Sequence, residues 1–314
     1  MEIFIFIIII LAVCIDIVLG ELPNYIHPVV WMGYLINFLK TYLINLKSRW
    51  SGVILTSILL ISFILPLLIL VYYIKFNYII YILFSSIILS STFSIKLLIS
   101  SARDINILLI NDPEKARRNV SYLVSRNTEN LNHSQLISAT VESLTENITD
   151  SIVAPILLAF ILGLPGAMFY RVINTLDAMV GYKNHENIII GWFPAKLDDL
   201  LNYIPARVTG LIIVISAFIL RMNWKNSFKI MIKHARIPPS PNSGYPMAAS
   251  AGALEIKLEK PNVYTIGVTK KNLDILTIEK AIKLTKMTIL IFLLSSTLFF
   301  SLLYYVLYIL SSYF

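Results

Sequence analysis

The stretch Glu142 to Leu164, ESLTENITDSIVAPILLAFILGL, joins a polar helix-forming segment directly to an apolar one. On a helix, Glu142, Glu146 and Asp150 would lie on one face, with Asn147 beside it. Like charges at this spacing repel each other by roughly 0.2 to 0.5 kcal/mol per pair, so the face needs water, a cation or a basic partner. A carboxylate face beside a membrane segment therefore predicts a functional site.

The composition is that of an integral membrane protein. Of the 314 residues, 57% are hydrophobic and 14% are charged, and the mean hydropathy is +0.76, which is far from the balance of a soluble domain. The longest apolar runs reach the ~20 residues that a spanning helix needs, so we expect one all-α, polytopic membrane domain. Full spans are expected near residues 3–19, 53–74, 78–100 and 288–310, and short or re-entrant apolar segments near 152–164 and 208–220.

The basic residues predict the orientation in the membrane. Between Met222 and Lys286 there are eleven Lys or Arg residues and four Asp or Glu residues, and by the positive-inside rule this segment is cytoplasmic. We expect the polar site on the cytoplasmic side of the cell membrane. It would be formed by four polar pieces, residues 20–51, 101–151, 170–207 and 221–285. Most aromatic residues lie in the apolar runs, which argues against nucleic-acid binding, and the oligomeric state stays open.

Two helix starts are predicted inside the second polar piece. Asp112-Pro113 places a capping residue before a proline at the first helical turn, and a second start lies near Asn132 to Ser134. The apolar runs thus alternate with polar helices.

Further acidic residues offer ligands for a hard cation. Asp177 ends the sequence NTLD, and Asp198 and Asp199 form a pair. Mg²⁺ prefers carboxylate and amide oxygens and takes only one or two protein carboxylates together with substrate phosphates. The alternative is that these acids cap helices and pair with Arg171 and other basic residues.

Two other motifs have both a functional and a structural interpretation. The turn PPSPNSG, Pro238 to Gly244, can present backbone N–H groups to an anion, with Arg236 just before it, or it is a plain surface loop. His27 precedes Pro28 at a membrane boundary, where a lone histidine is more often structural. No GxxxxGK[ST] loop is present, so a nucleotide would have to be held in another way.

Six motifs follow one another along nearly the whole chain. They are HPVVWMG (27–33), SARD (101–104), VESLTENITDSIVAP (141–155), YRVINTLDAMVGY (170–182), KLDDLLNYIPAR (196–207) and SPNSGYPMAASAGAL (240–254). In this order they resemble the membrane-bound adenosylcobinamide-phosphate synthases (cobinamide synthases) of cobalamin biosynthesis. The sequence departs from the family pattern at Asn127, where an aspartate is expected, at Lys196, where an arginine is expected, and in the looser segment KPNVYTIG, 260–267.

The resemblance implies an ATP-dependent carbon–nitrogen ligase. Its substrates would be adenosylcobyric acid, a corrinoid, and aminopropanol or aminopropanol phosphate, joined through a propionate carboxyl group, with Mg²⁺ and ATP as helpers. ATP would convert the carboxylate to an acyl phosphate or an acyl adenylate, and Mg²⁺ would neutralise the phosphates.

Roles for individual residues follow from this resemblance and remain hypotheses. On the carboxylate face, Glu146 and Asp150 are the preferred metal ligands, and Glu142 is expected to position Arg126 or another basic group. The metal ligands would be Glu146, Asp150 and Asp198; the catalytic groups His27, Glu142, Asn147, Asp177 and Asp199; and the substrate-binding groups Arg103, Arg126, Arg171, Asn174, Arg207, Arg236, Ser240, Asn242 and Tyr245.

Two other classes of protein fit parts of the pattern. An aspartate-rich membrane transferase also uses Mg²⁺ at spaced acidic residues. A transporter or non-catalytic scaffold would place ionisable residues well inside its spans, whereas here only Asp16, Lys75 and Lys96 lie in or near the long runs, which favours an interfacial enzyme in the lipid bilayer.

Overall fold

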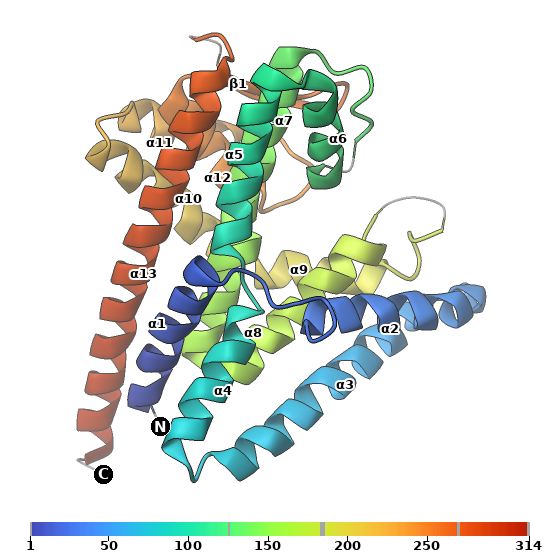
Figure 1. The fold of residues 1–314 in the computed structure, drawn as a ribbon, viewed down its shortest axis with the longest axis vertical. Coiled ribbons are helices and arrows are strands. Elements are labelled where there is room, and N and C mark those ends of the chain that lie inside the picture. Colours follow the sequence, from blue (N-terminus) through green and yellow to red (C-terminus); the bar gives the residue numbers. More distant parts are fainter. Residues whose placement is uncertain (1, 125, 183–185, 269–270, 313–314) are drawn as a thin grey trace. The chain divides into compact units, whose positions relative to one another are not determined.

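Helices make up nearly all of the regular structure (Figure 1). The structure is a computed structural model that describes residues 2–124, 126–182, 186–268 and 271–312. Within these residues, five helices are long and apolar enough to cross a membrane. The prediction of an all-α, polytopic membrane protein is confirmed.

The chain forms two compact units, each described by itself. The first unit contains residues 1–95, 154–201 and 300–314. Its helices are α1 (Glu2–Val18), α2 (Pro28–Leu43), the 3₁₀ turn Ile44–Leu46, α3 (Trp50–Ile74), α4 (Tyr78–Ser90), α8 (Ala154–Val180), α9 (Trp192–Leu201) and the end of α13 (Ile275–Ser312).

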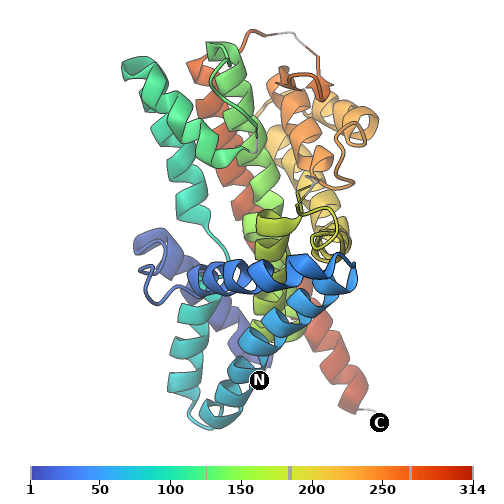
Figure 2. The ribbon, with the colours of Figure 1, turned by 90° about the vertical axis from the view of Figure 1, so that its right-hand side faces the viewer.

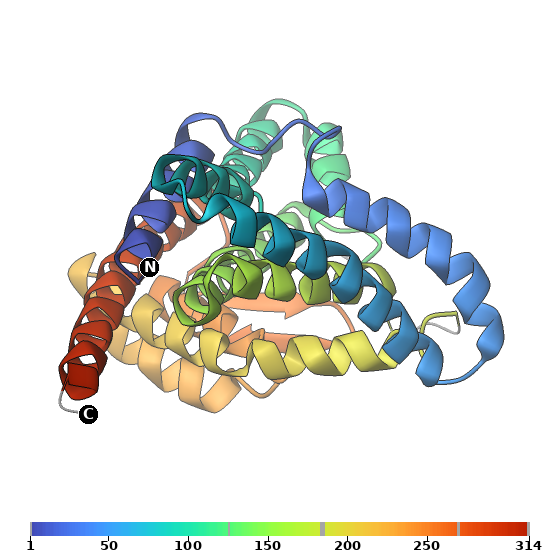
Figure 3. The ribbon, with the colours of Figure 1, turned by 90° about the horizontal axis from the view of Figure 1, so that it is seen from below.

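Helix packing in the first unit follows the apolar runs. Helix α1 packs against α4, and both α2 and α3 pack against α8. Helices α2 and α3 meet at the 3₁₀ turn and diverge from there (Figures 1 and 3). The exposed faces of α3 and α4 are rich in Ile and Leu, as expected for faces in contact with lipid.

The second unit contains residues 96–153 and 202–299. Helices α7 and α12 pack against each other, and α12 also packs against α10 and α11. Its elements are α5 (Ile95–Asn111), α6 (Pro113–Leu123), α7 (His133–Ile148), the π-helical turn Thr149–Val153, α10 (Tyr203–Ile219), α11 (Trp224–His234), α12 (Gly244–Leu254), β1 (Lys257–Lys260), β2 (Tyr264–Gly267) and most of α13.

The apolar run expected at residues 78–100 is broken into two helices. Helix α4 ends at Ser90 and α5 begins at Ile95, and the backbone N–H of Ile95 donates to Asp16 Oδ2 at 3.0 Å. Asp16 is only 1% exposed, so its carboxylate caps the restarted helix from α1. The run at residues 3–19 forms α1, whose 17 residues are fewer than the ~20 of a full perpendicular crossing.

The two short apolar runs have different structures. The run at residues 152–164 starts in the π-helical turn and ends at Gly163, whose φ of 68° and ψ of −161° interrupt α8 before Pro165. A positive φ is accessible to glycine because it has no Cβ. The run at residues 208–220 lies inside α10, which begins at Tyr203.

Local signals predicted two helix starts correctly, and both are confirmed. The Asp112 side chain accepts from the Lys115 N–H, and Asn132 forms a capping box with Gln135 at the start of α7. The antiparallel hairpin of β1 and β2, which pairs Leu258 with Ile266, was not predicted.

Candidate functional site

The carboxylate of Glu142 is fully engaged within the second unit. Its Oε1 accepts from Arg126 at 3.0 Å and from Ser138 at 2.8 Å, and its Oε2 accepts from the Tyr264 hydroxyl at 2.8 Å. Arg126 also donates to the backbone carbonyl of Glu259 at 3.0 Å. Glu142 therefore ties the β hairpin and the segment before α7 to α7 itself, and Arg126 is the basic group that it contacts.

The phenol of Tyr264 is a donor in this cluster. Burial raises its pKa, and the adjacent Glu142 carboxylate raises it further, because both penalise a phenolate. Tyr264 thus keeps its proton over the physiological pH range, and its hydroxyl group donates a hydrogen bond to Glu142. We name Arg126, Ser138, Glu142 and Tyr264 the clamp.

Glu146 lies one helical turn further along α7 and has a different environment. Its side chain is half-buried and lies close to Ser243, and Glu142, Lys260 and Arg126 are close enough to interact with its charge. Ser243 belongs to the SPNSG turn. The structure therefore brings the carboxylate face of α7 next to this turn.

The SPNSG turn is held by its own side chains and by α10. Ser240 Oγ accepts from the backbone N–H groups of Asn242 and Ser243, at 3.2 and 3.4 Å. A Cβ on Gly244 would lie 2.0 Å from the Ala235 carbonyl oxygen, so only glycine fits where α12 begins. The predicted turn at residues 238–244 is confirmed, with its backbone closely packed on the end of α11.

Arg207 of α10 supplies a cation at this turn. Its guanidinium lies 3.4 Å from the ring centroid of Tyr203 and 4.3 Å from that of Tyr245, and it donates to Asn242 Oδ1 at 3.3 Å. The two rings orient the planar group. Of the predicted substrate-binding residues, the structure brings together Arg207, Ser240, Asn242 and Tyr245, which we name the anion corner.

Four further predicted residues belong to the second unit. Arg236 is exposed just beyond α11, and Arg103 is exposed on α5. The Asn147 amide donates to the Ser143 carbonyl at 2.9 Å and is thus used within α7. Asp150 lies in the π-helical turn. Because a π turn holds more residues than an α turn, Asp150 is rotated from where a continuous α-helix would place it.

In the first unit, His27 caps a helix. Its Nδ1 accepts from the Val29 N–H at 3.2 Å at the start of α2. Burial lowers the pKa of His27, Glu21 raises it and Arg171 lowers it, with burial the largest effect. Because Nδ1 accepts, the proton of the neutral ring is on Nε2. In this state the free ring nitrogen of His27, Nε2, is a hydrogen-bond donor and cannot act as a base.

The remaining acidic residues of the first unit form a second polar group at the end of α8 and along α9. Asn174 donates to Asp198 Oδ1 at 3.4 Å, and Arg171 donates to Asn174 at the same distance. Asp177 and Asp199 lie close enough to repel each other. The predicted residues of NTLD and LDD thus meet within this unit.

Within the described residues, no group of three or more His, Cys, Asp or Glu side chains forms a preassembled metal site. The donors nevertheless fit Mg²⁺, because Glu146 and Ser243 place hard oxygens together at a half-buried position, and Mg²⁺ completes its shell with water and substrate phosphates. Arg207 and the turn beside it suit the phosphates of a nucleotide or a phosphate ester.

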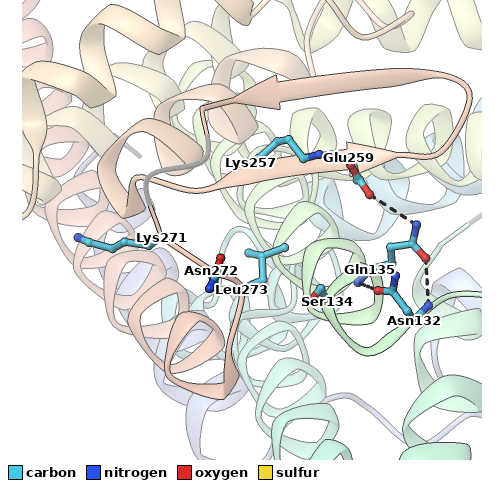
Figure 4. Close-up of a pocket in the computed structure, with 8 residues that line it drawn as sticks. All are labelled: Asn132, Ser134, Gln135, Lys257, Glu259, Lys271, Asn272 and Leu273. Carbon is cyan, nitrogen blue, oxygen red and sulfur yellow. Dashed lines mark hydrogen bonds and ion pairs between the residues drawn. The ribbon is translucent and has the colours of Figure 1, made fainter.

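A cavity of about 240 Å³ lies at the start of α7 (Figure 4). Each of its charged groups has an ion-pair partner, since Lys257 contacts Glu259 at 2.7 Å within the lining and Lys271 contacts Glu255 outside it. Gln135 bridges from Asn132 to Glu259 (Figure 4). This pairing makes the cavity part of the support for the hairpin.

Sequence reasoning missed the residues that come from the hairpin and the turn. Tyr264 and Glu259 lie more than a hundred residues from their α7 partners along the chain, and Ser243 was seen only as part of a turn. The segment 260–267 was noted for its departure from the family pattern, which was the one available signal.

A family model and individual relatives match the chain to the same group of proteins. The family model described as CobD/Cbib protein matches residues 9–292. A probable cobalamin biosynthesis protein CobD of Methanothermobacter thermautotrophicus is 49% identical over 92% of this chain and 96% of its own length. The corresponding protein of Methanocaldococcus jannaschii is 40% identical over 93% and 97%.

A bacterial relative extends the match. The cobalamin biosynthesis protein CobD of Leptospira interrogans is 41% identical over 81% of this chain and 82% of its own length. No solved structure matches the chain.

Proposed function

The chain belongs to the CobD/Cbib protein family, and we propose that it forms the amide bond that joins aminopropanol, or its phosphate ester, to a propionate carboxyl of adenosylcobyric acid. Its relatives are named for cobalamin biosynthesis, so it is a biosynthetic enzyme of this pathway with a corrinoid substrate. Its apolar helices make it a multi-pass membrane protein.

One observation carries the chemical part of the proposal. Glu146 lies close enough to Ser243 of the SPNSG turn to interact with it, and the same turn contacts Arg207 through Asn242. A carboxylate that suits a divalent cation therefore lies beside a turn and an arginine that suit phosphate oxygens. An ATP-dependent reaction that joins a carboxylate to an amine needs both a cation site and groups that bind phosphate.

The proposed reaction balances as an acid–amine ligation. The substrate carboxylate attacks ATP and becomes an acyl phosphate, with ADP released, or an acyl adenylate, with pyrophosphate released. The amine nitrogen then attacks the acyl carbon, a C–N bond forms, and phosphate or AMP leaves with the former carboxylate oxygen. The attacking amine gives up its protons to a base and to solvent.

The residues of this chain have separate tasks in that scheme. Glu146 and Asp150 would hold Mg²⁺, which when bound neutralises phosphate charge. The anion corner binds and orients the phosphates. In the first unit, Asp177 and Asp199 are the candidate bases, because their carboxylates lie close to each other in the polar group at the end of α8. Asp198 stays a predicted metal ligand.

The proposal also covers the role of Arg126 and the side of the membrane on which the site lies. Arg126 is used by the clamp, so its task is to hold the hairpin rather than to bind substrate. The excess of basic residues between Met222 and Lys286 supports a cytoplasmic position of the site.

A complementation experiment tests the proposal. A cobalamin-requiring host that lacks its own cobinamide synthase should grow with the wild-type chain and should not grow with Asp150→Ala or Asp198→Asn. Membrane fractions must contain equal amounts of all three proteins. Failure of the wild-type chain, although it is inserted, would contradict the proposed function, and full growth with both variants would remove the roles given to these acidic residues.

A further inference from the structure

Helix α2 carries a stripe of aromatic side chains on its outer face. Trp31, Tyr34, Phe38 and Tyr42 follow one another at helical spacing and are 49% to 72% exposed. The rings of Phe38 and Tyr42 contact each other with centroids 5.3 Å apart. Large aromatic side chains at this spacing form one continuous surface along the helix.

The opposite face of α2 fixes how the stripe points. Met32 and Ile36 are fully buried, and a Cβ on Gly33 would lie 3.8 Å from Met179 of α8. The helix is thus packed on its own unit through one face. The aromatic stripe is the face left for the surroundings.

By length and composition α2, with the 3₁₀ turn, counts as one of the five candidate spans, but it is the least apolar of them. Asn37 and Thr41 are exposed among the aromatic residues, and Lys40 lies in the same turn. Polar groups in the middle of a lipid-facing surface are costly in hydrocarbon. In the interface, where Trp and Tyr are enriched, the same mixture is favourable.

The direction of α2 within the first unit supports the same conclusion. In Figures 1 and 2, α2 runs crosswise to α4, and α4 packs against the apolar α1. If α1 and α4 follow the membrane normal, α2 lies along the membrane plane.

The charge of this part of the chain also fits a lipid surface. No acidic residue occurs between Pro28 and Arg103, whereas Lys40 lies beside the aromatic stripe and Lys47 and Arg49 follow it. Anionic lipid headgroups attract such basic residues. We propose that α2 is an interfacial helix that lies in the headgroup layer of the membrane, with its aromatic stripe between acyl chains and anionic headgroups.

Spin-label depth measurements test this proposal. In a Cys14→Ser background, which removes the exposed native thiol, single labels are placed by Tyr34→Cys, Phe38→Cys and Tyr42→Cys in the full chain. The protein is reconstituted in liposomes of phosphatidylcholine and phosphatidylglycerol. Depth is obtained from the relative accessibility to oxygen and to a water-soluble nickel chelate. Ile54→Cys, Ile61→Cys and Leu68→Cys on α3 are the matched controls.

The expected result is one shared depth near the phosphate level for the three α2 labels, while the α3 labels differ in depth. A spanning α2 would separate the labels at 34 and 42 by about 12 Å, and a depth profile that crosses the bilayer core would overturn the proposal. Labels shielded from both reagents, with dipolar broadening between molecules, would assign the stripe to contact with a second copy and would equally overturn it. None of these outcomes depends on amide formation.

Discussion

Glu142 and Glu146 lie one turn apart on the same helix, yet their surroundings are opposite. Glu142 is only 3% exposed and accepts three hydrogen bonds from Arg126, Ser138 and Tyr264. Glu146 is half-buried and faces the SPNSG turn. Both are glutamates in one predicted carboxylate face. The difference teaches that Glu142 holds the structure together, whereas Glu146 is the less tightly engaged carboxylate and the one left for chemistry.

Glu146→Gln gives the largest expected effect. The amide keeps the shape of the side chain but removes the charge that would bind a cation, so amide formation should fall about 100-fold or more. Initial rates of product formation with the purified protein measure this. Glu129→Gln, at an exposed position, is the matched control and should be unaffected. Unchanged turnover of the Glu146 variant would remove its assigned role.

Glu142→Ala should act on stability. Removing this carboxylate leaves the buried guanidinium of Arg126 unpaired, and breaking such a pair costs about 3 to 5 kcal/mol of unfolding free energy. Denaturant unfolding in detergent micelles measures the loss. Glu114→Ala removes the exposed partner of Arg117 and should cost less than about 1 kcal/mol. Equal losses in the two variants would show that the clamp is not a buried structural pair.

Tyr264→Phe tests the same clamp and should cost less unfolding free energy than Glu142→Ala. It deletes one hydrogen bond to a charged group and leaves Arg126 in place, so we expect a loss of about 1.5 to 3 kcal/mol in the same unfolding measurement. In the Glu142→Ala background the substitution should cost much less, because its partner is gone. Additive losses in the double variant would contradict the contact.

The smallest effect concerns pH and the first unit. Because burial lowers the pKa of His27 below its ordinary value of 6.5, the unfolded chain binds the proton more tightly than the folded chain. Stability should therefore decline as the pH falls through 6.5 and level off below the folded pKa. His27→Asn keeps a capping side chain and should flatten this slope in melting curves recorded from pH 5 to 8. An unchanged slope would exclude His27 as its source.

The sequence alone was sufficient for features set by local chemistry. Asp112 and Asn132 predicted two helix starts, because capping depends on residues three positions apart. The apolar runs predicted a helical membrane protein. The proximity of Glu142 and Arg126 followed from their positions around one short connection.

Features set by distant contacts were not predictable. The restart of the helix at Ile95 depends on Asp16, which lies far away in the chain, and Tyr264 reaches Glu142 only because the hairpin folds over α7. The π-helical turn that contains Asp150 was likewise not predicted from the regular helical spacing. Each case needs tertiary packing that single-sequence periodicity does not contain.

The most direct test of the account is product analysis with purified protein in lipid. Wild type and Glu146→Gln are incubated with adenosylcobyric acid, aminopropanol phosphate and Mg-ATP, and mass spectrometry follows the corrinoid while ADP and AMP are both measured. The account predicts a new amide that forms with wild type in proportion to the nucleotide consumed and is nearly absent with Glu146→Gln. No amide with folded wild-type protein, or equal yields from the two proteins, would contradict it.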